Sequence, residues 1–341
     1  MVRRGHGGYG WRYGLIDLSS NMNPLGTPRE LVALIKEAVE QGHYSHYPTE
    51  LGDELREALA NYEGSNLDTT YVFNGATEAL QILTMYLRPK HVIIPIPNYS
   101  DYSRTSRLIG AEIVHVEYWG YGSLRNLIMN KVVMHGSSVL LSNPNSPMGY
   151  MIPRDELLSL AEDIGKYGGY LVVDESFMDF VANEQSLIRY VNEHDNIIVV
   201  KSYTKFLAIP GLRVGAVYTR VDVEDLVPTW PVNSIAEYAV SRYMRYAHSF
   251  REETINYVNS EMGRILTILN ELGVQHYDSA THFFVIRDRP WFGEELRKRG
   301  FLIRDLSNVP PLSMGYFRVS IRDRTTNNEF LRALREVIQI N

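Results

Sequence analysis

Short apolar runs alternate with amphipathic segments along most of this chain. Runs rich in Val, Ile and Leu, which predict buried strands, stand at 71–73, 91–95, 112–116, 138–142, 170–174 and 196–200. Apolar residues recur with a helical period between them, at 27–41, 50–62, 79–87, 101–109 and 154–166. Continuous apolar strands separated by helices are typical of parallel sheets that are covered on both faces. We therefore expect an α/β fold with a mostly parallel sheet.

The pattern changes at both ends of the chain. Residues 1–30 are rich in Gly, Asn and Pro and predict an irregular arm, followed by a helix with Thr27 as its cap and Pro28 at its first position. A long helical stretch is predicted at 234–272, and strands at 283–286 and 317–321 alternate with helices after it. We expect the arm (1–30) to pack with a small α+β domain (251–341), beside a large domain (31–250).

Composition excludes several classes of protein. The chain has 341 residues, of which 45% are hydrophobic and 22% charged, as in ordinary globular proteins. Its net charge of −6 gives no reason to expect nucleic acid as a partner, so local cations must hold any anionic ligand. There are no cysteines, no long apolar run and no export signal, and we expect a soluble, cytoplasmic protein that binds neither membrane nor metal.

A lysine after the apolar run at 196–200 is the first candidate for chemistry. In an apolar setting Lys205 can lose its proton and attack a carbonyl group. Ser202 and Arg213, on either side of it, offer a hydroxyl group and a cation suited to a phosphate. A surface lysine before a Pro-Gly turn is the simpler alternative. The S-x-x-K spacing also occurs in serine β-lactamases, but those proteins need a K-T-G element that this chain lacks.

Two strand ends add further candidates. Asp174 closes the run at 170–174, where a carboxylate can hold a ring nitrogen protonated or simply cap a helix. The sequence Asn74-Gly75-Ala76-Thr77 follows another strand and precedes a helix. Such a turn presents free N–H groups to an anion, although an ordinary strand–helix connection has the same pattern.

Taken together, the segments around Asp174 and Lys205 resemble those of the pyridoxal phosphate enzymes with the aspartate aminotransferase fold. The resemblance spans nearly the whole chain. It implies fold type I, in which helices cover a mostly parallel seven-stranded sheet in a large domain beside a smaller α+β domain. It also implies pyridoxal 5′-phosphate as cofactor, with Lys205 and Asp174 as catalytic residues.

The same resemblance implies roles for other residues. It implies cofactor contacts for the residues Tyr47, Gly75, Ala76, Thr77, Tyr99, Ser146, Asp174, Phe177, Ser202, Lys205 and Arg213. In relatives the tyrosine matched by Tyr47 reaches the phosphate from the neighbouring subunit, so a homodimer with shared active sites is implied. Two positions depart from the family pattern, because Phe177 stands where many members have tyrosine and Ser146 where they have asparagine. We therefore expect fewer hydrogen-bond donors to the phenolic oxygen of the cofactor.

The substrate is indicated by less specific features. Arg318 matches the carboxylate-binding arginine of the family, and Arg304 stands where members with phosphorylated substrates bind phosphate. His6 and Asn21 would add phosphate contacts. The motifs around these residues and around 208–213 look most like threonine-phosphate decarboxylases of cobalamin biosynthesis, with histidinol-phosphate aminotransferases as close relatives. We expect decarboxylation of O-phosphothreonine to aminopropanol phosphate, with aminotransfer as the alternative. A regulatory protein that binds pyridoxal phosphate without catalysing a reaction is disfavoured, because Lys205 and Asp174 are present and no DNA-binding module is seen.

Overall fold

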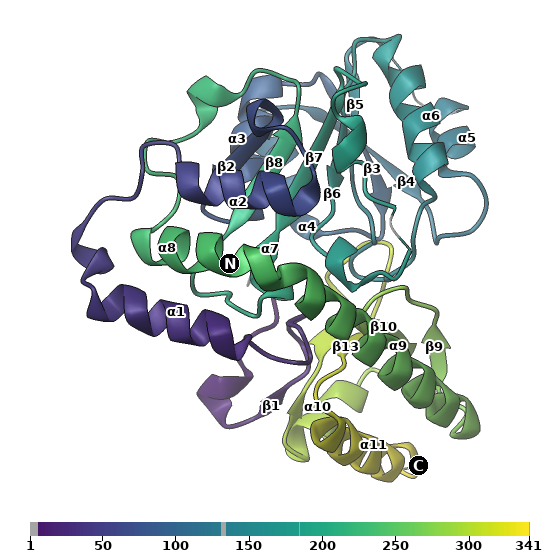
Figure 1. Cartoon of the computed structure of the whole chain (residues 1–341). Helices are drawn as coiled ribbons and strands as arrows, with labels where there is room; N and C mark the ends of the chain where they lie inside the picture. Colours follow the sequence, from purple (N-terminus) through teal and green to yellow (C-terminus); the bar gives the residue numbers. More distant parts are fainter. Residues whose placement is uncertain (1–5, 131–133, 184, 341) are drawn as a thin grey trace.

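A seven-stranded sheet forms the centre of the molecule, in a computed structural model that describes residues 6–130, 134–183 and 185–340 (Figure 1). Its strands lie in the order β2-β8-β7-β6-β5-β3-β4. They are β2 (Thr70–Phe73), β3 (His91–Ile96), β4 (Glu112–Glu117), β5 (Ser137–Ser142), β6 (Leu171–Asp174), β7 (Ile197–Ser202) and β8 (Gly215–Thr219). Only β8 runs antiparallel to its neighbours, so the expected mostly parallel sheet is confirmed.

Helices cover both faces of this sheet (Figure 1). They are α1 (Arg29–Glu40), α2 (Asp53–Glu63), α3 (Ala76–Leu87), α4 (Ser100–Leu108), α5 (Leu124–Met129), α6 (Arg154–Gly165), α7 (Tyr203–Phe206) and α8 (Ser234–Tyr243). Both faces are apolar because side chains alternate along each strand. On β7, Ile197 and Val199 pack into one core cluster, and Ile198 and Val200 pack into the cluster on the opposite face.

A second, smaller sheet follows the long helix α9 (Ala247–Glu271). It has four strands in the order β12-β13-β10-β9, and neighbouring strands run antiparallel. The strands are β9 (Gln275–Tyr277), β10 (Phe283–Arg287), β12 (Arg304–Asp305) and β13 (Tyr316–Ser320), and the accompanying elements are α10 (Phe292–Lys298), β11 (Phe301–Leu302) and α11 (Arg324–Ile338). The boundaries that we predicted at residues 30 and 250 stay predictions, since α9 itself runs across the second.

Three details differ from the expectations. The arm is partly regular, with a 3-10 turn at Gly10–Tyr13 and a strand β1 (Ile16–Asp17) that pairs in parallel with β11. The predicted Thr27 cap is wrong, because the Thr27 hydroxyl group donates to the carbonyl of Ala208 and α1 begins after Pro28 without a side-chain cap. The helical stretch at 234–272 is divided into α8 and α9 by a short 3-10 turn. Residues 1–5 of the arm lie outside the described residues.

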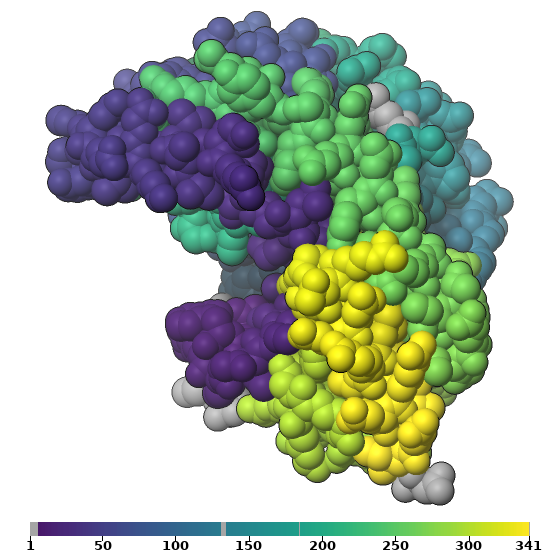
Figure 2. All heavy atoms as spheres, turned by 60° about the horizontal axis from the view of Figure 1, so that its bottom comes forward, coloured from purple at the N-terminus to yellow at the C-terminus, as the bar shows by residue number. Residues whose placement is uncertain are grey.

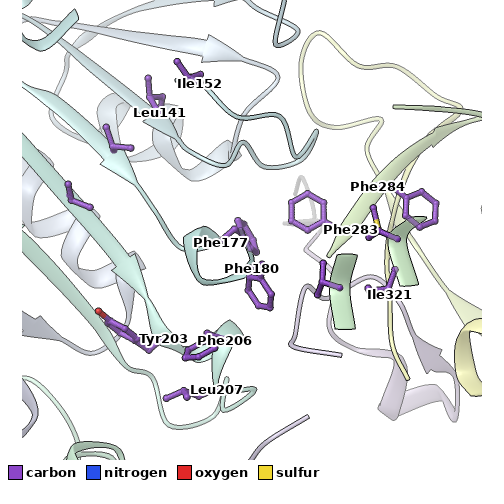
Figure 3. Close-up of a cluster of buried hydrophobic side chains, with 14 of the residues drawn as sticks. Leu141, Ile152, Phe177, Phe180, Tyr203, Phe206, Leu207, Phe283, Phe284 and Ile321 are labelled. Atoms are coloured by element: carbon purple, nitrogen blue, oxygen red, sulfur yellow. The ribbon is translucent and has the colours of Figure 1, made fainter. Parts of the chain in front are cut away.

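Aromatic side chains join the two sheets. Phe177 and Phe180, in the loop after β6, face Phe283 on β10 (Figure 3). The ring of His282 lies 3.7 Å from that of Phe180 and is fully buried in the same cluster. Burial and, to a smaller extent, the cationic side chains of Arg322, Arg318 and Lys205 together lower the pKa of His282 to about 3. No described helix is both long and apolar enough to cross a membrane.

The buried imidazole predicts a loss of stability in acid. His282 is neutral in the folded chain, whereas an unfolded histidine takes up a proton near pH 6.5. The contribution of neutral His282 to the free energy of unfolding is therefore fully present above pH 6.5. It declines as the pH falls toward 3, by about 1.4 kcal/mol for each pH unit. Replacing His282→Phe should flatten the pH dependence of the free energy of unfolding between pH 6.5 and 4.5, measured with denaturant. An equal slope in the variant would contradict the assignment, and His135→Asn, at an exposed position, is the control.

Candidate active site

A cavity opens where the carboxyl ends of the parallel strands face the four-stranded sheet. Turns after β2, β3, β5, β6 and β7 form one wall, and the arm together with β12 and β13 forms the other. This edge is where open α/β sheets generally bind ligands. Of the residues predicted for the site, those that line the cavity are His6, Asn21, Ala76, Thr77, Tyr99, Ser146, Asp174, Phe177, Lys205, Arg304 and Arg318.

Lys205 projects into this cavity from α7, a single turn that directly follows β7. Burial lowers the pKa of the Lys205 ammonium group, Asp174 partly offsets this effect, and Arg213 and Arg318 lower the pKa further. Its Nζ lies 5.1 Å from the centre of the Phe177 ring. A lysine whose neutral form is favoured is suited to attack a carbonyl carbon.

Asp174 is held in one orientation at the end of β6. Its Oδ1 accepts hydrogen bonds from the backbone N–H (3.0 Å) and the hydroxyl group of Ser176, and its Oδ2 accepts from the Tyr102 hydroxyl group at 2.8 Å. Burial raises the pKa of Tyr102, and the carboxylate beside it raises it further. Tyr102 was not predicted from the sequence, although it lies on α4 only three residues after Tyr99, which directly precedes that helix. The Tyr99 ring packs edge-on against Tyr102 at 5.4 Å.

A tight cradle lies at the start of α3. Gly75 has a positive φ of 86°, and a Cβ atom there would lie 2.5 Å from Nη2 of Arg213. A Cβ atom on Gly215 would lie 2.4 Å from the backbone nitrogen of Ala76. Two glycines therefore allow a guanidinium group to approach the free N–H groups of a helix N-terminus. This arrangement fits the phosphate group of pyridoxal phosphate.

Four predicted phosphate contacts lie outside the lining of the cavity: Gly75 and Arg213 of this cradle, and also Ser202 and Tyr47. The Ser202 hydroxyl group is buried and shares a hydrogen bond of 2.8 Å with Thr204, a second hydroxyl that we did not predict. Thr204 could have been suggested by the sequence, because it lies between Ser202 and Lys205 in the S-x-x-K motif. Tyr47 is 74% exposed and stacks on Trp230 with ring centres 4.0 Å apart. Within one chain, Tyr47 is not part of this cavity.

Two arginines give the opposite wall its charge. Arg304 and Arg318 are directly paired across β12 and β13. Arg318 donates to the hydroxyl group of Ser146 at 3.2 Å and to the carbonyl of Ser19 at 3.1 Å, and its buried Nε has no hydrogen-bond partner among the described residues. Arg304 donates to Oδ1 of Asn308 at 2.8 Å and to the carbonyl of Asp305.

Neither guanidinium group is neutralised. In the part of the chain that the structure describes, no carboxylate oxygen lies within 4.0 Å of a nitrogen of Arg304 or Arg318. Burial and, second to it, the neighbouring cation Arg304 together lower the pKa of Arg318 to about 9. Two adjacent cations without acidic partners form a site for a ligand with two anionic groups.

The arm completes the cavity. Asn21 is buried and its Oδ1 accepts a hydrogen bond of 2.6 Å from Ser320 at the end of β13. His6 lies 5.8 Å from the Tyr99 ring. The arm therefore brings Asn21 to the end of the strand that carries Arg318, and His6 to the cavity beside Tyr99.

Comparison with known proteins shows close relatives over nearly the whole chain. The family model described as aminotransferase class I and II matches residues 13–334. A protein of Caldanaerobacter subterraneus, provisionally named a threonine-phosphate decarboxylase, is 31% identical over 97% of this chain and 93% of its own length. A histidinol-phosphate aminotransferase of a Thermoanaerobacter species is 28% identical over 94% and 92%. The solved histidinol-phosphate aminotransferase of Clostridium acetobutylicum superposes with a TM-score of 0.86 at 24% identity, over 95% of this chain and 99% of its own, and confirms the predicted fold.

The cradle can be tested by filling it. Gly75→Ala would place a methyl group against Arg213 and strain the positive φ, so we expect the affinity for pyridoxal phosphate to fall at least about tenfold. The measurement is an absorbance titration with the cofactor. Gly110→Ala is the matched control, because Gly110 also has a positive φ but has no atom within 4 Å of the added carbon. Equal affinities in the two variants would show that Gly75 does not border the phosphate.

Proposed function

Because the chain belongs to the class I and II aminotransferase family, whose enzymes use pyridoxal phosphate, we propose that it acts on a phosphorylated amino acid. The proposed reaction is decarboxylation of L-threonine O-3-phosphate to aminopropanol phosphate and carbon dioxide, as a step of cobalamin biosynthesis. The observation that carries the proposal is the un-neutralised pair Arg304 and Arg318, in the cavity that also contains Lys205. O-phosphothreonine has the two anionic groups that such a pair requires.

In this proposal the residues around Lys205 hold the cofactor. When bound, pyridoxal phosphate supplies an electron sink that stabilises negative charge on the α-carbon of the substrate. Asp174, oriented by Ser176 and Tyr102, holds the ring nitrogen in its protonated form. Tyr99 contacts the ring, and the cradle at Gly75, Ala76 and Thr77 with Ser202 and Arg213 binds the phosphate, as we infer from the close approaches described above.

The two arginines orient the substrate. Arg318, whose Nε has no hydrogen-bond partner among the described residues and whose Nη1 donates to Ser146, binds the carboxylate. Arg304 binds the substrate phosphate together with His6 and Asn21. The angle at which the anions are held decides whether the α-carbon loses its carboxylate or its hydrogen. In the decarboxylation, the bond from the α-carbon to the carboxylate breaks and carbon dioxide leaves. A proton donated by Lys205 would then take the place of the carboxylate on the α-carbon.

Transfer of an amino group to or from histidinol phosphate is the second candidate. It is supported by the similarity to histidinol-phosphate aminotransferases, which is nearly as strong as that to the decarboxylase. Histidinol phosphate also has a phosphate for Arg304, but it has no carboxylate for Arg318. In that reaction the carboxylate of 2-oxoglutarate would occupy Arg318 in the second half of the cycle.

We further propose a homodimer in which Tyr47 enters the site of the partner. The loop that carries Tyr47 is fixed to α8, since buried Glu237 accepts hydrogen bonds from the backbone N–H (2.9 Å) and hydroxyl group of Thr49. An exposed tyrosine on a well-anchored loop is suited to contact another chain. Figure 2 shows the surface hollowed between the arm and the segment around α1, beside this loop.

The substrate is tested by an assay with O-phosphothreonine. We expect release of carbon dioxide, and aminopropanol phosphate detected by mass, without any need for 2-oxoglutarate. In Lys205→Ala the rate should fall by about 10²–10⁴-fold or more, and borohydride should no longer trap the cofactor on the chain. Arg304→Gln should raise KM for this substrate, while Arg297→Gln on α10 serves as the control.

Two outcomes would contradict the proposal. Consumption of 2-oxoglutarate with histidinol phosphate, and no carbon dioxide from O-phosphothreonine, would favour the aminotransferase. A trapped cofactor that maps to a lysine other than Lys205 would overturn the assignment of the site itself.

Sharing of the site is tested by mixing two inactive variants. Tyr47→Ala lacks the contact in trans and Lys205→Ala lacks the lysine, so each alone should be nearly inactive. After unfolding and refolding as an equal mixture, half of the dimers are mixed and each has one intact site, so about a quarter of the wild-type activity should return. Dimers that form but stay inactive, or a fully active Tyr47→Ala variant, would refute a shared site.

A further inference from the structure

Asn23 joins the arm to the turn that carries Lys205. It directly follows Asn21 and Met22, which line the cavity, and it is only 3% exposed. Its backbone N–H donates to the carbonyl of Lys205 at 3.0 Å. Its Nδ2 donates to the carbonyl of Phe206 at 2.9 Å and to the hydroxyl group of Thr254, on α9, at 2.8 Å. The residue thus connects three segments that are distant in the sequence.

The turn needs donors from outside. A helix of four residues has little stability of its own. The N–H groups of Leu207 and Ala208 donate to the carbonyls of Tyr203 and Lys205, but the carbonyl of Phe206 receives no such bond from the described residues that follow it. The residue four positions after Phe206 is Pro210, which has no N–H group to donate. The N–H of Ile209 donates instead to Thr204. Asn23 therefore supplies the hydrogen bond that the chain around Phe206 does not make.

The preceding residues of the arm are attached to the other wall. Arg322, at the end of β13, donates to the carbonyl of Asp17 at 2.6 Å and to that of Ser20 at 2.7 Å. Between these two carbonyls lies Ser19, whose carbonyl accepts from Arg318. Residues 17–20 are thus hydrogen-bonded to Arg318 and Arg322, on and just after β13. Asn23 is instead hydrogen-bonded to the turn that carries Lys205.

We propose that Asn23 is a positioning residue that fixes Lys205 relative to the arm and to Arg318. It acts through the carbonyl end of α7 and not by touching the substrate. The inference rests on the proposed function in one respect, the assignment of Lys205 as the lysine that holds the cofactor. Loss of the Asn23 side chain would let α7 shift while both arginines keep their positions. The lysine would then be misplaced and substrate binding would be preserved.

The test compares Asn23→Ala with Asn196→Ala. Asn196 is a matched control, because its Nδ2 also donates to two carbonyl groups, those of Ala161 on α6 and Gly169 in the loop before β6, and none of these residues lines the cavity. For Asn23→Ala we expect the dissociation constant for pyridoxal phosphate to rise at least about tenfold and kcat to fall at least about tenfold, with KM within about threefold of wild type. Asn196→Ala should leave all three unchanged even if its melting temperature falls.

Milder and harsher variants extend the test. Thr27→Val removes the hydroxyl group that donates to Ala208, just after the same turn, and should weaken cofactor binding in the same direction but less. It replaces Asn23→Ala if that variant does not fold. Asn23→Asp, which places a carboxylate against the Phe206 carbonyl, should bind the cofactor more weakly than Asn23→Ala.

The possible results separate the two proposals. If the wild-type chain is not trapped by borohydride at Lys205, the proposed function fails. If the wild type is trapped there, but Asn23→Ala loses thermal stability and keeps its cofactor affinity and kcat, Asn23 has only a structural role and this inference alone is overturned.

Discussion

A lysine buried behind the sheet holds together the two turns on which the site depends. Lys201, on β7, contacts Glu63 at 2.6 Å and Asp179 at 3.1 Å, and all three side chains are at most 10% exposed. Although burial lowers the pKa of Lys201, Asp179 and Glu63 raise it overall, so the ammonium group stays charged. Replacing Lys201 with a neutral residue would leave the buried carboxylates of Glu63 and Asp179 without their ammonium partner, at a cost of about 3–5 kcal/mol. Lys201 lies four residues before Lys205, and Asp179 lies five residues after Asp174. The ion pair between Lys201 and Asp179 therefore connects the turn after β7 to the turn after β6.

The cationic side chains near these turns have different kinds of partners. Behind the sheet, Lys201 has two carboxylates, whereas in the cavity Arg304 and Arg318 have only neutral acceptors. The chain as a whole carries a charge of −6, so this positive region is local and does not follow from composition. Arginines held by carbonyl and hydroxyl groups keep their place without losing their charge to an internal partner. The site is therefore ready for anions before any ligand arrives.

Features set by local sequence could be predicted, and features set by contacts across the chain could not. The strand runs and the motif residues Asp174 and Lys205 were found because periodicity and spacing are visible in a single segment. The short strand β1 pairs with β11 almost three hundred residues away, so no local pattern marked it. Likewise, Asn23 looked like part of a loop. Its partners Phe206 and Thr254 become neighbours only in the folded chain.

The departure at position 146 lies beside Arg318, which the proposed function assigns to the substrate carboxylate. The oxygen of Ser146 accepts a hydrogen bond from Arg318, and the one hydrogen of the hydroxyl group remains available to donate. A serine thus keeps one of the hydrogen-bond donors that our sequence analysis took to be lost, whereas Phe177 can donate none. A carboxylate that draws Arg318 toward itself would loosen the bond to Ser146 and free its oxygen. The two substitutions at this end of the cavity are therefore not equivalent, because Ser146 can donate a hydrogen bond and contacts Arg318, whereas Phe177 has no hydrogen-bond donor.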